Sequence, residues 1–236
     1  MINTDTSKKS IDTHLTKTEE HAVEKQVKRP DESSGIYVRG HIKIFDPKSG
    51  EVFIDKPNAI HYENFSVALA NSIANKSQNF IYEMNFGNGG TSVDPTGIIT
   101  YLPTNTDGQK TKLYNPTYSK SGDDTAISNP DPTNNKMLPT HVPGTVYTDI
   151  LISCLLDYGE PSGQAVFDNS TNLNGEYVFD ELGLRGRSTD GTSGLTSTGL
   201  LLTHVVFHPV QKALNRLIQI DYTVRIQTLT NLSTNG

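Results

Sequence analysis

Apolar and polar residues alternate along the segment 217–229, which is the period of a β-strand with one buried and one exposed face. Six further segments of similar length have strand-like patterns and are separated by residues that favour turns. One of them, 145–158, is apolar along much of its length, as expected of a strand buried on both faces. The predicted strands are 36–45, 51–55, 80–86, 145–158, 177–184, 200–208 and 217–229.

A single segment, 61–76, follows helical spacing, with apolar residues recurring every three or four positions. The strands 36–45 and 51–55 are joined by the turn-forming residues 46–50 and predict a β-hairpin. Because the strands do not alternate with helices, a parallel α/β sheet is not expected. The sequence therefore predicts an all-β fold: an antiparallel β-sandwich, jelly-roll-like, over residues 35–229, with one helix, a long loop insertion and an extended N-terminal arm.

The first 34 residues form a polar arm that cannot build a core of its own. They contain six basic and seven acidic side chains and no aromatic one. Their few apolar residues recur at four-residue spacing, which allows a marginal amphipathic helix that is mostly unfolded in isolation. Such an arm is either a disordered tail or an element that becomes ordered against another subunit, and residues 230–236 are predicted to be a C-terminal tail. The arm residues expected to contact a partner are Ile11, Leu15, Val23 and Val27.

Residues 87–143 form a second polar segment, dominated by Gly, Pro, Asn, Asp, Ser and Thr and interrupted by a short apolar run at 98–102. A connection of this length inside a domain is uncommon, and is usually a binding loop, an inserted arm or a disordered surface segment. We expect a second interaction element here, with Tyr101, Tyr114 and Tyr118 as its contact residues.

The charge of the chain gives no sign of a nucleic-acid or membrane partner. The formal net charge is −6, and basic residues do not form a stripe interleaved with aromatic ones. No run approaches the roughly 20 apolar residues that cross a bilayer, and the N-terminus lacks the apolar region of a secretory signal. We therefore expect a soluble protein that is not exported by the general route.

Three local motifs resemble functional sites but have simpler structural explanations. The Gly-rich segment 87–91 lacks a Gly-Lys-Ser/Thr ending, so we expect a turn whose glycines permit positive φ and close approach of another chain. His204 and His208 are four residues apart, which on a strand is roughly 13 Å and too far for one metal ion; surface cross-strand pairs are expected. The adjacent Asp180 and Glu181 point to opposite faces of a strand, so each is expected to be solvated or locally hydrogen-bonded.

The remaining sequence predicts neither catalysis nor a bound cofactor. The one cysteine, Cys154, excludes an internal disulfide and a cysteine-built zinc site, and its place in the most apolar strand predicts an inert thiol. No spacing matches a calcium loop, although calcium stays open, and there is no Gly-x-Ser-x-Gly elbow. A Ser/His/Asp triad depends on geometry, which the sequence leaves open. We predict no catalytic, metal or cofactor-binding residue and no enzymatic activity.

Several segments resemble the structural proteins of tailed bacteriophage particles. They are 40–53 (GHIKIFDPKSGEVF), 58–60 (NAI), 86–91 (FGNGGT), 179–184 (FDELGL), 201–212 (LLTHVVFHPVQK) and 217–226 (LIQIDYTVRI). The resemblance implies a non-enzymatic virion component at the neck, tail or capsid surface, assembled in the host bacterial cytoplasm. Its partners are expected to be other virion proteins and further copies of the chain, bridged by the N-terminal arm and the long loop. The alternative is a host-receptor or carbohydrate-binding module of a phage particle.

Overall fold

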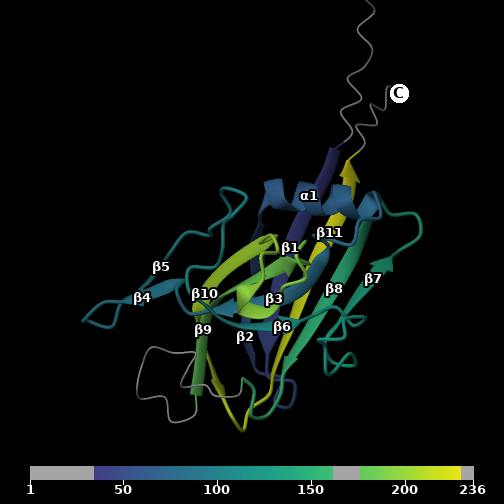
Figure 1. Ribbon diagram of the computed structural model, residues 1–236. Coiled ribbons are helices and arrows are strands. Elements are labelled where there is room, and N and C mark those ends of the chain that lie inside the picture. The colour runs from purple at the N-terminus through teal and green to yellow at the C-terminus, as the bar shows by residue number, and fades with distance from the viewer. Residues whose placement is uncertain (1–34, 162–175, 230–236) are drawn as a thin grey trace, which may run out of the picture.

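The computed structural model describes residues 35–161 and 176–229 (Figure 1). The predicted tail and the four predicted contact residues of the arm lie outside this part of the chain: Ile11, Leu15, Val23 and Val27. The helix α1 spans Tyr62–Ile73 and the short 3₁₀-helix η2 spans Gly194–Thr196. The strands are β1 (Gly35–Phe45), β2 (Val52–Ile60), β3 (Ile81–Gly87), β4 (Thr91–Val93), β5 (Ile99–Tyr101), β6 (Pro116–Ser121), β7 (Lys136–His141), β8 (Tyr147–Leu156), β9 (Glu176–Gly186), β10 (Thr203–Ala213) and β11 (Ile218–Leu229).

Nine of the strands form one sheet in the order β6-β3-β9-β10-β2-β1-β11-β8-β7. The strands β10 and β2 pair through only two residue pairs, Thr203 with Ile60 and His204 with Ala59, so the sheet turns a corner there. The layer β6-β3-β9-β10 then faces the layer β2-β1-β11-β8-β7 across the corner. The predicted all-β, antiparallel, sandwich-like fold with a single helix is confirmed.

The two layers enclose a hydrophobic core to which strands of both contribute. The alternation noted in the sequence puts one face of each strand into this core, and Ile42 of β1 lies opposite Tyr222 of β11 in register. Aromatic rings fill the centre, where Phe179 meets Phe86 and Phe207 edge-to-face at centroid distances of 5.4 and 5.8 Å. The pattern of alternation thus fixes which face of each strand is buried.

A polar contact ties the two layers together near their outer strands. The ammonium group of Lys120 on β6 donates to the carbonyl oxygen of Leu155 on β8 at 2.6 Å, and it also pairs with Glu160. Since β6 is an edge strand of one layer and β8 lies next to the edge of the other, this contact holds the curled sheet closed.

The helix α1 lies across one end of the sandwich (Figure 1). His61 is its N-cap, and its ring nitrogen Nδ1 accepts the backbone N–H of Asn64 at 3.2 Å. Phe65 and Ala68 are buried on the inner side, and the Asn64 amide donates to the carbonyl of Leu201 at 2.8 Å. The helix is therefore attached to the sheet by both apolar packing and hydrogen bonds.

Two differences from the sequence prediction bear on the site. Segment 87–143 contains four strands, β4 to β7, which the alternation did not indicate because they are short and polar and because two of them contain Pro116 or Pro139. The strand β2 also continues to Ile60, whereas the sequence predicted a strand over 51–55 that ends before Pro57. A proline is tolerated there because Pro57 pairs only with β1 and not with β10.

Candidate functional site

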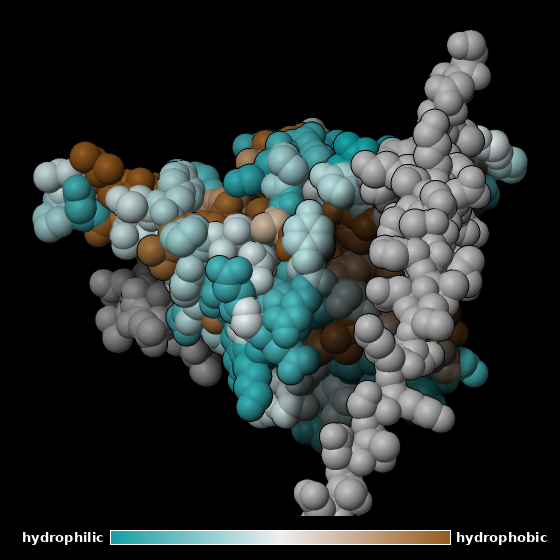
Figure 2. Space-filling view, turned by 90° about the horizontal axis from the view of Figure 1, so that it is seen from above, coloured by the Kyte–Doolittle hydropathy of each residue, from teal (hydrophilic) through white to brown (hydrophobic). Residues whose placement is uncertain are grey.

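The strands β4 and β5 form a two-stranded hairpin that projects from the sandwich (Figure 1). Figure 2 shows apolar side chains gathered at its outer end. The large apolar side chains exposed on the hairpin and just after it are Val93 (62%), Ile98 (63%), Tyr101 (50%) and Leu102 (39%). Apolar groups gathered on one exposed element mark a surface that binds another molecule. This hairpin is the candidate interaction site.

The turn of the hairpin has a defined shape. The carboxylate oxygen Oδ1 of Asp94 accepts the backbone N–H groups of Thr96 at 2.8 Å and Ile98 at 3.0 Å, and the Thr96 hydroxyl at 2.6 Å. These hydrogen bonds hold the pKa of Asp94 below its usual value, and the one from the Thr96 hydroxyl has the largest effect. Gly97 follows with a φ of +85°, a conformation that glycine adopts without strain.

The base of the hairpin is held by Asp180 of β9. Its Oδ1 accepts the N–H of Gly90 at 2.9 Å, and its Oδ2 accepts the N–H of Thr91 at 2.8 Å and the Thr91 hydroxyl. Burial raises the pKa of Asp180 in spite of these donors. Because an isolated two-stranded hairpin is only marginally stable in water, this attachment keeps β4–β5 in place.

The neighbouring carboxylate, Glu181, is fully buried and accepts four hydrogen bonds. Its Oε1 accepts the N–H groups of Asn115 at 2.8 Å and Gly89 at 3.2 Å, and its Oε2 accepts the N–H of Tyr114 at 2.9 Å and the ring of His204 at 3.0 Å. Burial alone raises the pKa of Glu181, but the hydrogen bonds from His204 and the backbone outweigh it and lower the pKa. Glu181 thereby joins two separate segments of the insertion to β9.

His204 is also buried, so the prediction that it lies on the surface is wrong. Its Nδ1 accepts the backbone N–H of Asn105 at 2.7 Å, which assigns the proton to Nε2 and makes that nitrogen the donor to Glu181. Both ring nitrogens are thus occupied by hydrogen bonds within the protein. His208 is exposed, as predicted, and its Nδ1 lies 3.2 Å from the hydroxyl of Tyr101.

Asp180, Glu181 and His204 together form what we call the anchor. Their hydrogen bonds explain the Gly-rich segment 87–91, since a Cβ on Gly87 would lie 2.4 Å from Oε1 of Glu181. A Cβ on Gly90 would lie 2.9 Å from a methyl carbon of Val206. The glycines allow a close approach of the backbone to the anchor of the same chain, and the predicted positive φ is wrong, since Gly87, Gly89 and Gly90 do not have it.

The three tyrosines predicted as contact residues have different surroundings. Tyr101 lies at the end of β5 and is half exposed. Tyr114 is partly exposed, and its hydroxyl donates to the carbonyl of Pro103 at 2.8 Å. Tyr118 packs against Phe86 at a ring-centroid distance of 5.8 Å, and its hydroxyl donates to Glu160 at 2.8 Å, so it belongs to the packing of the sandwich. Only the first lies on the hairpin.

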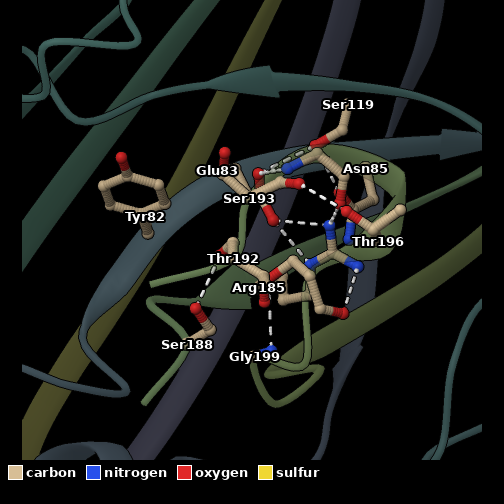
Figure 3. Close-up of polar contacts among 12 residues, drawn as sticks. Tyr82, Glu83, Asn85, Ser119, Arg185, Ser188, Thr192, Ser193, Thr196 and Gly199 are labelled. Carbon is tan, nitrogen blue, oxygen red and sulfur yellow. Dashed lines mark hydrogen bonds and ion pairs between the residues drawn. The ribbon is translucent and has the colours of Figure 1, made fainter. Parts of the chain in front are cut away.

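A second buried polar cluster lies on the outer side of β3 and β9 (Figure 3). The guanidinium group of Arg185 donates to Oε1 of Glu83 at 2.7 Å and to the carbonyl of Gly194. Oε2 of Glu83 accepts the N–H of Gly194 at 2.9 Å and the hydroxyl of Ser119 at 3.0 Å. The cluster attaches the connection between β9 and β10 to the sheet.

Other candidate chemistry is limited in the described residues. Cys154 is buried, as predicted, and burial raises the pKa of its thiol to about 12. Within residues 35–161 and 176–229, no group of three or more His, Cys, Asp or Glu side chains is placed to hold a metal ion. In the same part of the chain, no helix has the length and apolar character needed to span a membrane.

Comparison with protein-family models, with curated proteins and with solved structures finds no match to this chain. The site therefore rests on its own geometry. Sequence reasoning missed the anchor. The two adjacent carboxylates and the Gly-rich segment 87–91 are visible in the sequence, but nothing in it places one against the other. Because side chains alternate along a strand, one of Asp180 and Glu181 is expected on the outer, solvent-facing side of β9. In the structure, segment 87–143 covers that side, so both carboxylates are buried.

Proposed function

We propose that the chain is a non-enzymatic structural subunit of a tailed bacteriophage particle, located in the virion, and that it binds neighbouring subunits through the β4–β5 hairpin. The observation that carries this proposal is an apolar hairpin held away from the sandwich by a buried polar anchor. Exposed apolar side chains such as Val93 and Ile98 are stabilised when a partner covers them. The N-terminal arm is the second bridging element in this proposal.

The chemistry of the anchor supports a structural role. Its carboxylates accept backbone N–H groups from the hairpin base and from residues 105–115, and its imidazole has no free nitrogen. A buried network in which every polar group is hydrogen-bonded makes a loop rigid. Its polar groups are then not available to bind a substrate. A rigid projecting element suits a subunit that must meet its neighbour in one orientation.

Quantitative mass spectrometry of purified particles from the phage that encodes the chain tests the proposal. We expect every particle to contain the chain, in the same number of copies. Limited proteolysis should cut the hairpin turn at 94–98 in the free protein and leave it intact in the particle. Absence of the chain from purified particles would refute the proposal.

A cleft beside the start of α1 favours a second candidate function, a carbohydrate-binding module of a phage particle. The cleft has a volume of about 620 Å³ and lies between β1, β2 and the loop at 106–108. Two exposed tyrosines, Tyr37 and Tyr62, line it together with the charged groups of Arg39 and Glu63. Aromatic rings beside polar groups are suited to binding a sugar. Binding on a glycan array that is lost in Tyr62→Ala would favour this candidate, and no binding would leave the structural role ahead.

A further inference from the structure

An apolar groove opens at the end of the sandwich that α1 covers. Its volume is about 300 Å³, and its walls come from α1, the start of β3, and the strands β7, β8 and β11. The lining is apolar except for one serine, and it includes Leu69, Phe80, Met137, Ile150 and Ile226. A space of this size with so few polar groups holds water poorly, so an apolar side chain from outside can fill it favourably.

We propose that this groove binds the tip of the β4–β5 hairpin of a second copy of the chain. This inference rests on the proposed function and names the partner and both contact surfaces. The tip presents Val93 and Ile98, branched aliphatic side chains that are each more than half exposed. Val93 pairs with Ile99, and Ile98 lies opposite Asp94, so the two side chains lie on opposite faces at the end of the hairpin and either one can enter the groove.

The charges around the two surfaces are complementary. The exposed Asp94 gives the tip a negative charge. The guanidinium group of Arg187 lies 5.8 Å from the ring centroid of Phe80, which lines the groove. Among the described residues, Arg187 has no carboxylate partner within ion-pair distance. A positive group therefore lies beside the groove, and the tip that would enter it carries a negative one.

A hairpin cannot reach the groove of its own chain. The strand β3 begins at Ile81, which lines the groove, and ends at Gly87, where the hairpin segment starts. These ends are about 20 Å apart along the strand, and the anchor holds the hairpin base at the far end. The contact therefore joins different copies, with a different surface on each. Such a contact repeats from copy to copy and produces a ring or a filament.

Disulfide trapping between mixed single-cysteine variants tests the contact. Val93→Cys places a thiol on the tip, and Ser72→Cys places one at the groove mouth, where the native hydroxyl donates to the carbonyl of Ala68 in the same helix. Cys154 is buried and gives little background. We expect a disulfide-linked dimer when the two variants are mixed under mild oxidation. The matched control is Val52→Cys, an exposed apolar position at the start of β2, which should not link to Ser72→Cys.

Sedimentation velocity tests the same contact without cysteines. The full chain should associate as its concentration rises, and Ile98→Asp should weaken this association by tenfold or more, about the effect of losing one buried isoleucine. Ser72→Trp fills the groove and should have a similar effect, whereas Val52→Asp should have none. Circular dichroism checks that each variant is folded. A wild-type chain that stays monomeric up to about 100 μM, or equal linking of the control cysteine, would overturn the proposal.

The two proposals can fail separately. If the chain is present in particles but Val93→Cys and Ser72→Cys do not link, the hairpin binds another virion protein and the groove contact is wrong. If the two variants link but purified particles lack the chain, the contact stands and the virion role is wrong.

Discussion

Replacing Glu181 with glutamine should destabilise the protein by about 2–6 kcal/mol. The carboxylate accepts four hydrogen bonds in a fully buried place, and glutamine keeps a single acceptor oxygen. His204 cannot relieve the loss by moving its proton, because the N–H of Asn105 occupies its other ring nitrogen. Two buried donors therefore face an amide NH₂ group, and each unsatisfied donor costs about 1–3 kcal/mol.

Urea denaturation measures this change as a shift of the midpoint at constant slope. Hydrogen exchange should show where it acts, with faster exchange at 87–91 and 105–115 than in the wild type. The matched control is Asp94→Asn, the same acid-to-amide change on the exposed turn, where water can replace lost hydrogen bonds, so we expect a much smaller loss of stability than in Glu181→Gln. A loss below about 0.5 kcal/mol in Glu181→Gln, or exchange unchanged at both segments, would refute the reasoning.

The pH dependence of the same variant gives an independent check. The pKa of Glu181 is lowered in the folded protein relative to its usual value of 4.5. The unfolded chain therefore binds this proton more readily, and the stabilisation is present above pH 4.5 and lost as the pH falls through the folded value. The stability difference between the wild type and Glu181→Gln should shrink below pH 4.5. Asp180 is present in both proteins, so its own titration does not affect the comparison to first order.

Three further substitutions test other parts of the structure. Arg185→Met should cost about 3–5 kcal/mol in urea denaturation, because it leaves the buried carboxylate of Glu83 without its cation. Lys212→Met should raise the free energy of unfolding at pH 7, because burial lowers the pKa of Lys212 from 10.5 to about 8. Between these two pH values the unfolded wild type binds more protons than the folded one, so the stability of the wild type rises with pH. The difference in stability between Lys212→Met and the wild type should therefore be smaller at pH 10 than at pH 7. Gly199→Ala should lower the melting temperature by several degrees, since its Cβ would lie 1.9 Å from the carbonyl oxygen of Gly186.

Matched variants separate these effects from general loss of stability. Arg225→Met removes an ion pair with Asp149 near the surface and should cost much less stability than Arg185→Met. If it costs as much as Arg185→Met, burial is not the reason for the larger effect. Gly191→Ala, with no atom within 4 Å of its Cβ, isolates the strain of a positive φ from the clash at Gly199. If the stability difference between Lys212→Met and the wild type is the same at pH 7 and pH 10, the lowered pKa of Lys212 is contradicted.

Alternation in the sequence predicted the strands that build the core, because a strand with one buried face must repeat with period two. Segment 217–229 is the clearest case, and β11 occupies almost the same residues. The spacing of Phe65 and Leu69 predicted α1 for the same kind of reason, since a helix with one buried side repeats at 3.6 residues. Each of these elements puts one face against the core.

The site could not be predicted in the same way. The base of the hairpin and the segment 105–115 are held by hydrogen bonds to Asp180, Glu181 and His204, which lie between 66 and 99 residues further along the chain. Alternation describes one segment at a time and carries no information about which distant backbone covers a carboxylate.

The sequence by itself determined the fold class, the single helix and the buried face of each core strand, because these follow from local periodicity and the free energy of burying apolar side chains. The tertiary structure alone decided that a polar insertion becomes a projecting hairpin, and that His204 is buried rather than exposed. The reason is that a buried hydrogen bond depends on the distance between groups in space, and those groups are far apart in the chain.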